Sequence, residues 1–531
     1  MNLARATAVM SLGTVLSRVT GLLRLAAIAA ALGVVESGRV TDTYNLANTA
    51  PNIIYELVLG GILTSVFVPV FVELLDKEGR EKAWAVASAV INVSVVVLVA
   101  ITTILVLAAP LIARLYAIRL EGAEQVQQQE AMTFLLRLFI PQIIFYGLTA
   151  LTAGLLNAHK RFGAPMYAPV LNNIAVICVF MAFHQAYPSI TGLEGISTKQ
   201  LFIIGFGTTA GVALMAFAQL PFLRGLGRYR FTFSLKHPSI KKLARLSTFV
   251  IGYVITNQIG YFIVQWLANA QEGAYSAYVS AFTFFMLPHG LFAVSIITAL
   301  LPDMSQHASN ARWDELRERL SVGVRTTFFL IFPASVGYFV LGEPIVRILL
   351  EHGVMTARST ELVAGVLQFF VIGLVPFSLF QLFLRAFYAL QDTKTPFLIN
   401  CGAVALNAAV NIPMFAWLGV RGLAAGHALA YIFGVTVQGR SLSKRIGGLD
   451  GRRLTRNALK IAIASLVMGA LVWGLSQVVD RLVPLDALSG QIIAVLVPVL
   501  GGLVAYLGLS QVLGIEELGY VRGLIARRSS R

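Results

Sequence analysis

Two arginines in one apolar stretch are the side chains of this chain best suited to bind an anion. Arg18 and Arg24 lie in the sequence SRVTGLLR, with Gly21 between them. Arginine binds phosphate and pyrophosphate oxygens through two parallel hydrogen bonds. On an ideal helix the two side chains point about 120° apart, so we expect a bend or local unwinding at Gly21 to turn them towards one ligand. The alternative is that one or both arginines form ion pairs that hold helices together.

Two carboxylates accompany the arginines. Asp42 stands at the mouth of the next apolar run, and Glu56 lies near its middle. An ionisable side chain at the centre of a membrane helix costs about 2.5–3.5 kcal/mol on insertion scales, so such residues usually face a cavity or a partner. Glu56 is either a proton or ion relay, a switch partner of the arginines, or half of a static ion pair. We expect Arg18, Arg24, Asp42 and Glu56 to form a binding site, with no catalytic residue, metal or cofactor.

Other ionisable residues within apolar runs have simpler explanations. Arg137 and Arg385 are near basic loops and can reach the membrane surface along their aliphatic stems. His289 and His427 fit hydrogen-bonded structure better than proton transfer. The amphipathic stretch ARWDELRERL, residues 311–320, is expected to form a helix along the membrane surface.

The composition indicates a chain whose surroundings are mostly lipid. Of its 531 residues, 57% are hydrophobic and only 12% are charged, about half the charged share of a soluble domain. The formal net charge of +16 would suggest nucleic acid in a soluble protein. Here the basic residues stand in short loops between apolar runs, so we expect no nucleic-acid partner. The two cysteines, Cys178 and Cys401, lie in apolar segments and imply no disulfide framework.

Apolar runs long enough to cross a bilayer predict an all-α, polytopic membrane protein with about fourteen transmembrane helices. Lys and Arg are concentrated in alternate loops, which by the positive-inside rule places both termini in the cytoplasm. The expected spans are residues 7–32, 43–74, 84–113, 131–157, 164–184, 199–223, 246–269, 276–301, 321–342, 361–390, 395–417, 422–439, 458–479 and 488–514.

The chain also shows an internal repeat. GLLNAHKRFGAP and AFYALQDTKTP both end one span and begin the next, roughly 230 residues apart. GGILTSVF and VSIITALL form a second, weaker pair at a similar offset. We therefore expect two parallel six-helix repeats related by an axis along the membrane normal. The expected parts are a lobe at 1–223, a basic linker at 224–245, a lobe at 246–439, a basic loop at 440–457, two additional helices at 458–514 and a basic tail at 515–531.

Several functions lack their usual motifs. No GxxxxGK[ST] phosphate-binding loop, HExxH motif or TVGYG filter occurs in the sequence. Transport driven by bound ATP, an intramembrane hydrolase and a potassium-type pore are therefore disfavoured.

Several longer motifs match one known family. SRVTGLLR, TDTYNLANTAPN, LLNAHKRFGAPMYAPVLNN, LPHGLFAVSIITALLP and above all FYALQDTKTP resemble the MurJ/MviN family, in collinear order over about residues 1–440. The resemblance implies the fold of the multidrug/oligosaccharidyl-lipid/polysaccharide exporter superfamily. It also implies a bacterial inner-membrane flippase that moves lipid II, the undecaprenyl-pyrophosphate-linked cell-wall precursor, to the outer leaflet. By position, Arg18, Arg24 and Asp42 match family residues important for function, and the two additional helices match a groove for the lipid tail.

Three features depart from the family pattern. Tyr55 and Glu56 stand where many relatives have basic residues, and Thr283 stands near the position of a family arginine. Spans seven and eleven offer only neutral groups such as Asn257 and Asn407 where some relatives hold sodium with carboxylates. We therefore expect fewer positive charges in the cavity and leave voltage or proton coupling open.

Other functions stay open at this stage. The chain could export another lipid-linked oligosaccharide or a drug, or act as a non-transporting scaffold for cell-wall synthesis and division proteins. Expensive charges at membrane depth argue against a scaffold. Lipid II and membrane lipids are the expected partners, and the sequence leaves the oligomeric state open.

Overall fold

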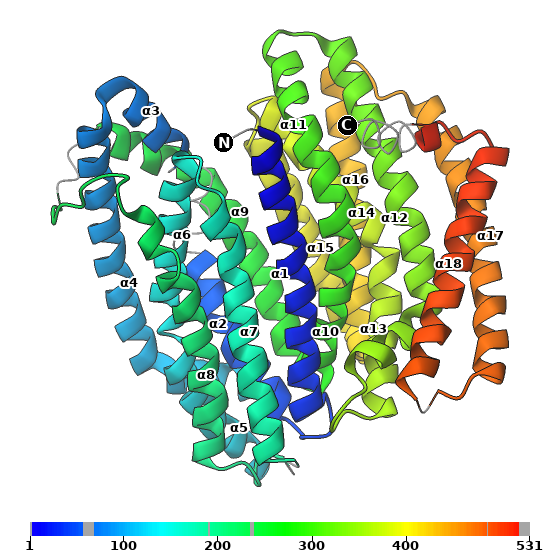
Figure 1. The fold of residues 1–531 in the computed structure, drawn as a ribbon, viewed down its shortest axis with the longest axis horizontal. Coiled ribbons are helices and arrows are strands. Elements are labelled where there is room, and N and C mark those ends of the chain that lie inside the picture. The colour runs from blue at the N-terminus through cyan, green and yellow to red at the C-terminus, as the bar shows by residue number, and fades with distance from the viewer. Residues whose placement is uncertain (1–2, 57–67, 189–191, 234–237, 486, 520–531) are drawn as a thin grey trace. The chain divides into compact units, whose positions relative to one another are not determined.

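A computed structural model describes residues 3–56, 68–188, 192–233, 238–485 and 487–519 (Figure 1). All regular elements in these ranges are helices. The chain divides into two compact units. Unit 1 comprises Met1–Ser276 and His352–Ser359, and unit 2 comprises Ala277–Glu351 and Thr360–Arg531.

The helices of unit 1 begin near the N-terminus and continue to the start of α10. They are α1 (Leu3–Leu32), α2 (Val40–Tyr55), α3 (Val68–Glu78), α4 (Arg80–Ala117), α5 (Gly122–Phe139), α6 (Gln142–Ala158), α7 (Gly163–Ala186), α8 (Thr198–Phe217), the short η3 (Leu220–Leu223), α9 (Pro238–Ala268) and the first turn of α10 (Ala274–Pro288).

Unit 2 contains the rest of α10 and the helices that follow it. They are η4 (His289–Ala293), α11 (Val294–Ser309), α12 (Trp313–Leu350), α13 (Ala357–Ile372), α14 (Leu374–Ala389), α15 (Lys394–Leu418), α16 (Val420–Ile446), α17 (Gly451–Leu482) and α18 (Leu488–Val512). The first turn of α13 belongs to unit 1.

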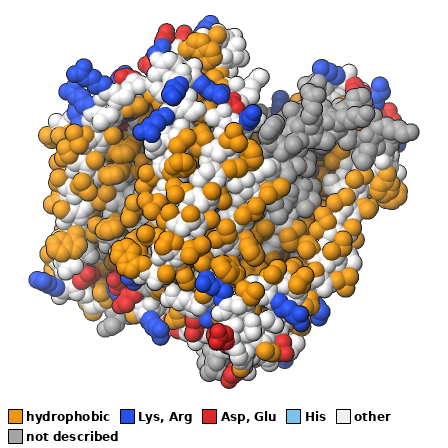
Figure 2. All heavy atoms as spheres, turned by 180° about the vertical axis from the view of Figure 1, so that it is seen from behind, with side chains coloured by type: hydrophobic (Ala, Val, Ile, Leu, Met, Phe, Trp, Pro, Cys, Tyr) orange, Lys and Arg blue, Asp and Glu red, His pale blue; other side chains and the backbone are white. Residues whose placement is uncertain are grey.

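The helices carry apolar side chains on surfaces that the protein itself does not cover. Leu107 of α4 is 75% exposed and Val504 of α18 is 73% exposed. Along the helices visible in Figure 2, hydrophobic side chains cover the middle, and Lys, Arg, Asp and Glu gather near the ends. In water such a surface would be unfavourable, whereas lipid tails solvate it well.

Eleven helices in the described residues are long and apolar enough to cross a membrane. The number becomes twelve if α13 and α14, bent by 48° at Gly373, form one broken span. The chain is therefore an all-helical, multi-pass membrane protein. The predicted span at 43–74 falls partly outside the described residues.

Three turns share one geometry, those at Lys160, Ala311 and Gln391, and the first and last of them stand at the offset of the predicted repeat. Lys160, after α6, has φ 58°, and Gln391, after α14, has φ 57°. Around Lys160 the backbone bonds are Lys160 N–H to Asn157 C=O at 2.9 Å and Arg161 N–H to Leu156 C=O at 2.8 Å.

The turn after α14 repeats this pattern. Gln391 N–H donates to Tyr388 C=O at 3.0 Å, and Asp392 N–H donates to Phe387 C=O at 2.9 Å. Both are helix ends closed by a left-handed residue, and all four pairs of equivalent residues stand at one offset. The long helices α4 and α12 also match, with 38 residues each. This match supports the predicted duplication.

One sequence-based expectation about local structure was wrong. Residues 311–320 do not form a separate surface helix, because α12 continues without a break from Trp313 to Leu350. The charged first turns of α12 give way to apolar residues along the same helix. An amphipathic pattern marks a change of environment along a helix as readily as it marks a separate interfacial one.

Candidate functional site

Helix α1 carries both predicted anion-binding arginines. It is helical throughout, so the expected unwinding at Gly21 is absent. The helix packs along α7, where the Asn173 side-chain amide donates to Thr20 Oγ1 at 3.0 Å and to the Ser17 carbonyl at 3.2 Å (Figure 1). A Cβ at Gly21 would be 3.8 Å from Asn173 Nδ2, an ordinary van der Waals distance, so this packing does not itself require a glycine.

The two arginines differ in their surroundings. Arg18 is exposed and Arg24 is half-buried. Neither arginine forms a hydrogen bond or an ion pair within the described residues. The alternative interpretation, an ion pair with Asp42 or Glu56, is therefore wrong for this structure. An arginine without a counter-charge at membrane depth favours the approach of an anion.

Arg24 lies close to two tyrosines of unit 1. Its charge acts on the hydroxyl groups of Tyr44 on α2 and Tyr146 on α6. Tyr44 is hydrogen-bonded to Thr208 at 2.8 Å, and Tyr146 is hydrogen-bonded to Asn52. These tyrosines place neutral hydrogen-bonding groups, rather than a carboxylate, beside the guanidinium. A ligand of Arg24 would therefore meet no competing negative charge from them.

Glu56 directly follows α2, next to Tyr55, whose ring lies beside Tyr146. The rings of Tyr55 and Tyr146 are 5.8 Å apart between centroids. The Glu56 side chain is exposed and has no hydrogen-bond partner within the described part of the chain. Glu56 and Arg24 therefore form no ion pair with each other in this structure.

Asp42 is held away from the arginines. It is fully buried, and its carboxylate accepts the Gly273 N–H at 2.6 Å, the Ser276 N–H at 2.8 Å and the Ser276 hydroxyl at 2.7 Å. These donors belong to the beginning of α10, where unpaired N–H groups and the helix dipole favour a negative charge. Within unit 1, Asp42 therefore caps a helix.

The loop before α2 contains a second capping carboxylate that the sequence analysis missed. Glu36 accepts the Thr356 N–H at 2.9 Å, the Thr356 hydroxyl at 2.6 Å and the Ser359 hydroxyl at 2.8 Å, all at the start of α13. Half burial alone would raise the pKa of this carboxyl, but these bonds and one from Val34 N–H hold its pKa below the ordinary value. The available signal was weak: Thr356 precedes a helix whose third residue is Ser359 rather than the Glu of a capping box.

A third buried polar group, Arg39, lies between the two caps. Its guanidinium pairs with Glu124 of α5 and donates to the Asn269 carbonyl at 2.8 Å. Asn269 is also hydrogen-bonded to Gln128 of α5 at 2.9 Å and 3.0 Å. Loop 33–42 is thus fastened to α5, to the end of α9 and to the first turns of α10 and α13, all within unit 1.

The comparisons with known proteins cover nearly the whole chain. The family model for the lipid II flippase MurJ matches residues 28–489. The chain belongs to the MurJ family. Among curated MurJ proteins, a probable lipid II flippase of Rhizobium tropici is 29% identical over 96% of this chain and 94% of its own length. The lipid II flippase MurJ of Burkholderia cenocepacia is also 29% identical, over 80% of both chains.

Solved structures agree on the fold. A structure described as "Lipid II flippase MurJ, inward closed conformation" has a TM-score of 0.74 at 24% identity, and the match covers 97% of this chain and 99% of that one. An inward-facing multidrug transporter of the MOP superfamily has a TM-score of 0.66 at 14% identity, covering 81% of this chain and 96% of that one. This MurJ chain therefore has the fold that the resemblance implied.

Apart from Glu56, the positions where this chain departs from the family pattern carry neutral side chains. The Tyr55 ring is tilted against the Tyr146 ring, and the Thr283 hydroxyl donates to the Val279 carbonyl of its own helix at 2.9 Å. Asn407 and Asn411 are hydrogen-bonded to each other at 3.0 Å. No group of three or more His, Cys, Asp or Glu residues able to hold a metal occurs among the described residues.

Two histidines within helices of unit 2, His289 and His427, have different environments. His289 is hydrogen-bonded to the Ser378 hydroxyl at 3.0 Å. His427 is surrounded by aromatic rings, with the Tyr431 ring 4.7 Å and the Phe370 ring 5.2 Å away between centroids. Its Nε2 has no hydrogen-bond partner among the described residues. Both are packing residues in this structure.

Proposed function

We propose that this chain moves lipid II across the bacterial cytoplasmic membrane, from the inner to the outer leaflet. Membership of the MurJ family supports this substrate, because the curated relatives are named for it. The observation that carries the proposal is Arg24, a half-buried arginine on an apolar helix without a counter-charge in the described residues. A pyrophosphate offers the oxygens and the negative charge that such a guanidinium lacks.

The binding site in this proposal is centred on α1. Arg24 binds the pyrophosphate, and Arg18 attracts the anion from the more exposed part of the helix. Glu56 stands next to Tyr55 without a described partner, where it repels a carboxylate or takes a proton as the anion enters. Asp42 contributes indirectly, by fixing the first turn of α10.

The topology that fits this role has about fourteen spans with both termini in the cytoplasm. The run at 43–74 and helix α9 add two spans to the twelve counted from the described helices. The two lobes are residues 1–223 and 246–439, joined by the basic linker at 224–245. Two parallel repeats of this kind rock around a central site in other transporters. The caps made by Glu36 and Asp42 then lie on the outer side.

The transport cycle follows from differential binding. The pyrophosphate binds more tightly to one conformation than to the other, and only this difference in free energy shifts the population. Entry of the anion next to Arg24 removes the cost of an unpaired charge and favours closure on the inner side. Release on the outer side requires the Glu36 and Asp42 caps to open, because both hold loop 33–42 to helix N-termini.

A different substrate is the second candidate. The fold likeness to multidrug transporters at 14% identity favours export of a drug or another lipid-linked oligosaccharide. A purely structural role as a scaffold for cell-wall synthesis proteins is the candidate from another class. The unpaired Arg24 distinguishes them, because a scaffold has no use for it.

Bacterial cells whose own lipid II flippase can be switched off test the proposal. The measurement is the accessibility of lipid II to an externally added enzyme that cleaves it. Expression of this chain should restore accessibility, and Arg24→Ala should abolish most of it. Arg137→Ala is the matched control, because it removes an exposed arginine of α5. Normal insertion without restored accessibility would contradict lipid II as substrate.

A further inference from the structure

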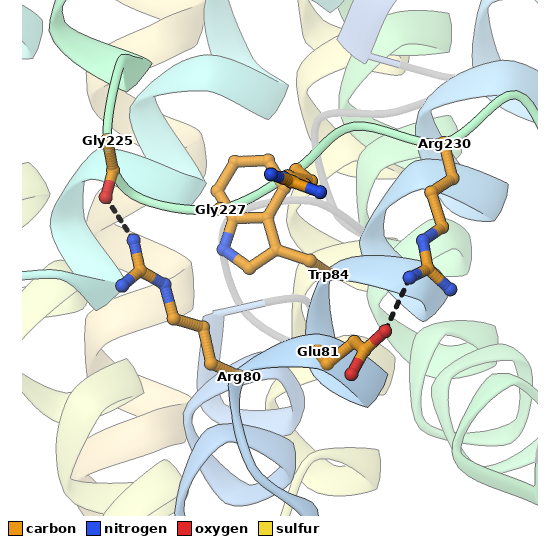
Figure 3. A pocket seen from close by; sticks show the side chains of 7 residues that line it. Arg80, Glu81, Trp84, Gly225, Gly227 and Arg230 are labelled. Atoms are coloured by element: carbon orange, nitrogen blue, oxygen red, sulfur yellow. Dashed lines mark hydrogen bonds and ion pairs between the residues drawn. The ribbon is translucent and has the colours of Figure 1, made fainter.

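A segment after η3 lies along the beginning of α4 without helical structure. We call residues 224–233 the strap. The guanidinium of Arg80, the first residue of α4, donates to the backbone carbonyls of Gly225 and Leu226 (Figure 3). These bonds fix the start of the strap on α4.

Further bonds continue along the next turns of α4. The Arg230 N–H donates to the Ser88 hydroxyl at 3.1 Å, and the Asn92 amide donates to the Thr232 carbonyl at 2.8 Å. The Tyr229 hydroxyl is also hydrogen-bonded to Asn92. The strap is therefore a built part of unit 1, held by its backbone.

A cavity of about 510 Å³ lies between the strap and α4 (Figure 3). Its volume is large enough for a phosphate group with attached glycerol. It is lined by Arg80, Glu81, Trp84, Gly225, Gly227, Arg228 and Arg230. The lining is therefore polar and mainly basic.

The indole of Trp84 is the unusual group in this lining. The residue is only 4% exposed, yet its Nε1–H has no hydrogen-bond acceptor among the described residues. The strap passes directly over the ring, since a Cβ at Gly227 would lie 2.2 Å from Nε1. Figure 3 shows the indole between Arg80 and Arg230, with its nitrogen towards Arg80. A buried donor without an acceptor costs free energy that a bound oxygen recovers.

The charges of the cavity also call for an anion. Arg230 pairs with Glu81, which is the only carboxylate in the lining. Arg80 is bonded to uncharged carbonyl groups, and Arg228 has no ion-pair or hydrogen-bond partner within the described residues. Two positive charges therefore remain without counter-charges around one unmet N–H donor. The two non-bridging oxygens of a phosphate diester can accept hydrogen bonds from these arginines and from the indole N–H.

Aromatic side chains alternate with the arginines along the strap. Tyr229 is 54% exposed, Phe231 79% and Phe233 47%, and the rings of Phe231 and Phe233 are in edge contact at 5.1 Å between centroids. These three residues do not line the cavity. Exposed aromatic residues next to arginines are typical of segments at the membrane–water interface, where rings enter the headgroup layer.

We propose that this cavity binds the phosphate of an anionic phospholipid. Its ligands are Arg228, the Trp84 N–H and Arg230, whose exposed pair with Glu81 uses only one of its guanidinium nitrogens. The charge of Arg80 lies beside them. The exposed rings of the strap enter the same leaflet and hold the lipid's glycerol end at the cavity mouth. A soluble phosphate would use the basic groups but would not account for the exposed rings. The inference requires only that the chain is a membrane protein, and it is independent of lipid II transport.

The test uses the purified full-length protein in neutral detergent. Native mass spectrometry measures the apparent affinity for phosphatidylglycerol and, as a neutral probe, phosphatidylcholine. The wild type should bind phosphatidylglycerol more tightly. Arg228→Gln/Arg230→Gln should weaken phosphatidylglycerol binding about tenfold or more, because charge-assisted hydrogen bonds are lost. Trp84→Phe keeps the ring but removes the donor, and should weaken binding by a smaller factor.

The matched control is Arg224→Gln/Arg312→Gln, which removes two exposed charges that do not line the cavity. It should leave the affinity nearly unchanged. Equal loss in both double variants would overturn the proposal, because the effect would then be general attraction to basic loops. So would equal affinity of the wild type for both lipids. Displacement of the lipid by millimolar glycerol 3-phosphate would assign the site to a soluble phosphate instead. Trp84→Phe keeps the test decisive if the double variant does not fold.

Discussion

The carboxylate of Asp42 accepts both the backbone N–H and the hydroxyl of Ser276, at 2.8 Å and 2.7 Å. One side chain near the start of α2 thus closes the first turn of α10, in a fully buried place. A carboxylate matched to a helix N-terminus in this way contributes more than an exposed ion pair, because no water screens it.

Replacement of Asp42 by Asn should therefore destabilise the protein, by about 1–3 kcal/mol. The amide offers one acceptor in place of two and loses the favourable interaction with the helix dipole. Melting temperatures of Asp42→Asn, Ser276→Ala and the double variant in one detergent measure the effect. We expect the double variant to lose less than the sum of the single losses, since the two residues share their bonds. Additive losses would contradict direct coupling.

The cap made by Glu36 should depend on pH. The hydrogen bonds from Thr356 and Ser359 hold the folded pKa of Glu36 below its ordinary 4.5, despite half burial. A lowered folded pKa gives stability that is complete above the ordinary pKa and is lost as the pH falls through the folded value. The melting temperature of the wild type should exceed that of Glu36→Gln at about pH 7, and the difference should shrink below about pH 4. A difference that stays constant down to acidic pH would contradict this account.

The left-handed turns after α6 and α14 should accept glycine with a gain in stability. Lys160 and Gln391 have φ near 58°, where a Cβ is unfavourable and glycine is not. We expect Lys160→Gly and Gln391→Gly each to stabilise the protein by about 0.5–1 kcal/mol. Alanine at either position keeps the Cβ and serves as the control. Loss of stability with glycine would indicate that the side chain itself has an essential contact.

A buried ion cluster at the start of α12 should be sensitive to the loss of one partner. Arg325 is 3% exposed and pairs with Glu516 and with the buried Glu517. Arg325→Met leaves Glu517 with only the Asn457 amide and should cost about 3–5 kcal/mol.

Two further variants test whether the buried charge is the cause. Arg325→Met/Glu517→Gln should recover much of the loss, because no unpaired charge stays buried. Arg453→Met removes an exposed partner of Glu516 and should cost less than about 1 kcal/mol. The melting temperatures of the three variants decide between these outcomes. A double variant as unstable as Arg325→Met would show that packing, rather than charge, is responsible.

The sequence was sufficient for the features that depend on local pattern. Apolar runs predicted the helices, and the motif around Gln391 predicted the family and a helix stop, because such a stop needs particular local geometry. The two six-helix repeats stay a prediction. The unwinding at Gly21 was wrong because a glycine allows a bend without requiring one, and α1 is helical on both sides of it.

Long-range partners could not be predicted. Asp42 was expected near the arginines, since spacing along the chain says nothing about which distant helix supplies its donors. The contact of the strap with Trp84 was missed for a similar reason: an irregular segment has no periodicity to show which face it presents. The binding role of Arg18, Arg24, Asp42 and Glu56 stays a prediction.

The paired turns after α6 and α14 give this molecule an internal reference for experiments. Both have the same backbone bonds and the same φ, but one places Lys160 and Arg161 at its tip and the other Gln391 and Asp392. The same substitution made in each turn therefore compares two chemical surroundings on one backbone within a single chain. A difference between the two changes in stability reflects the side chains and their neighbours, because the cost of the backbone conformation is the same in both turns.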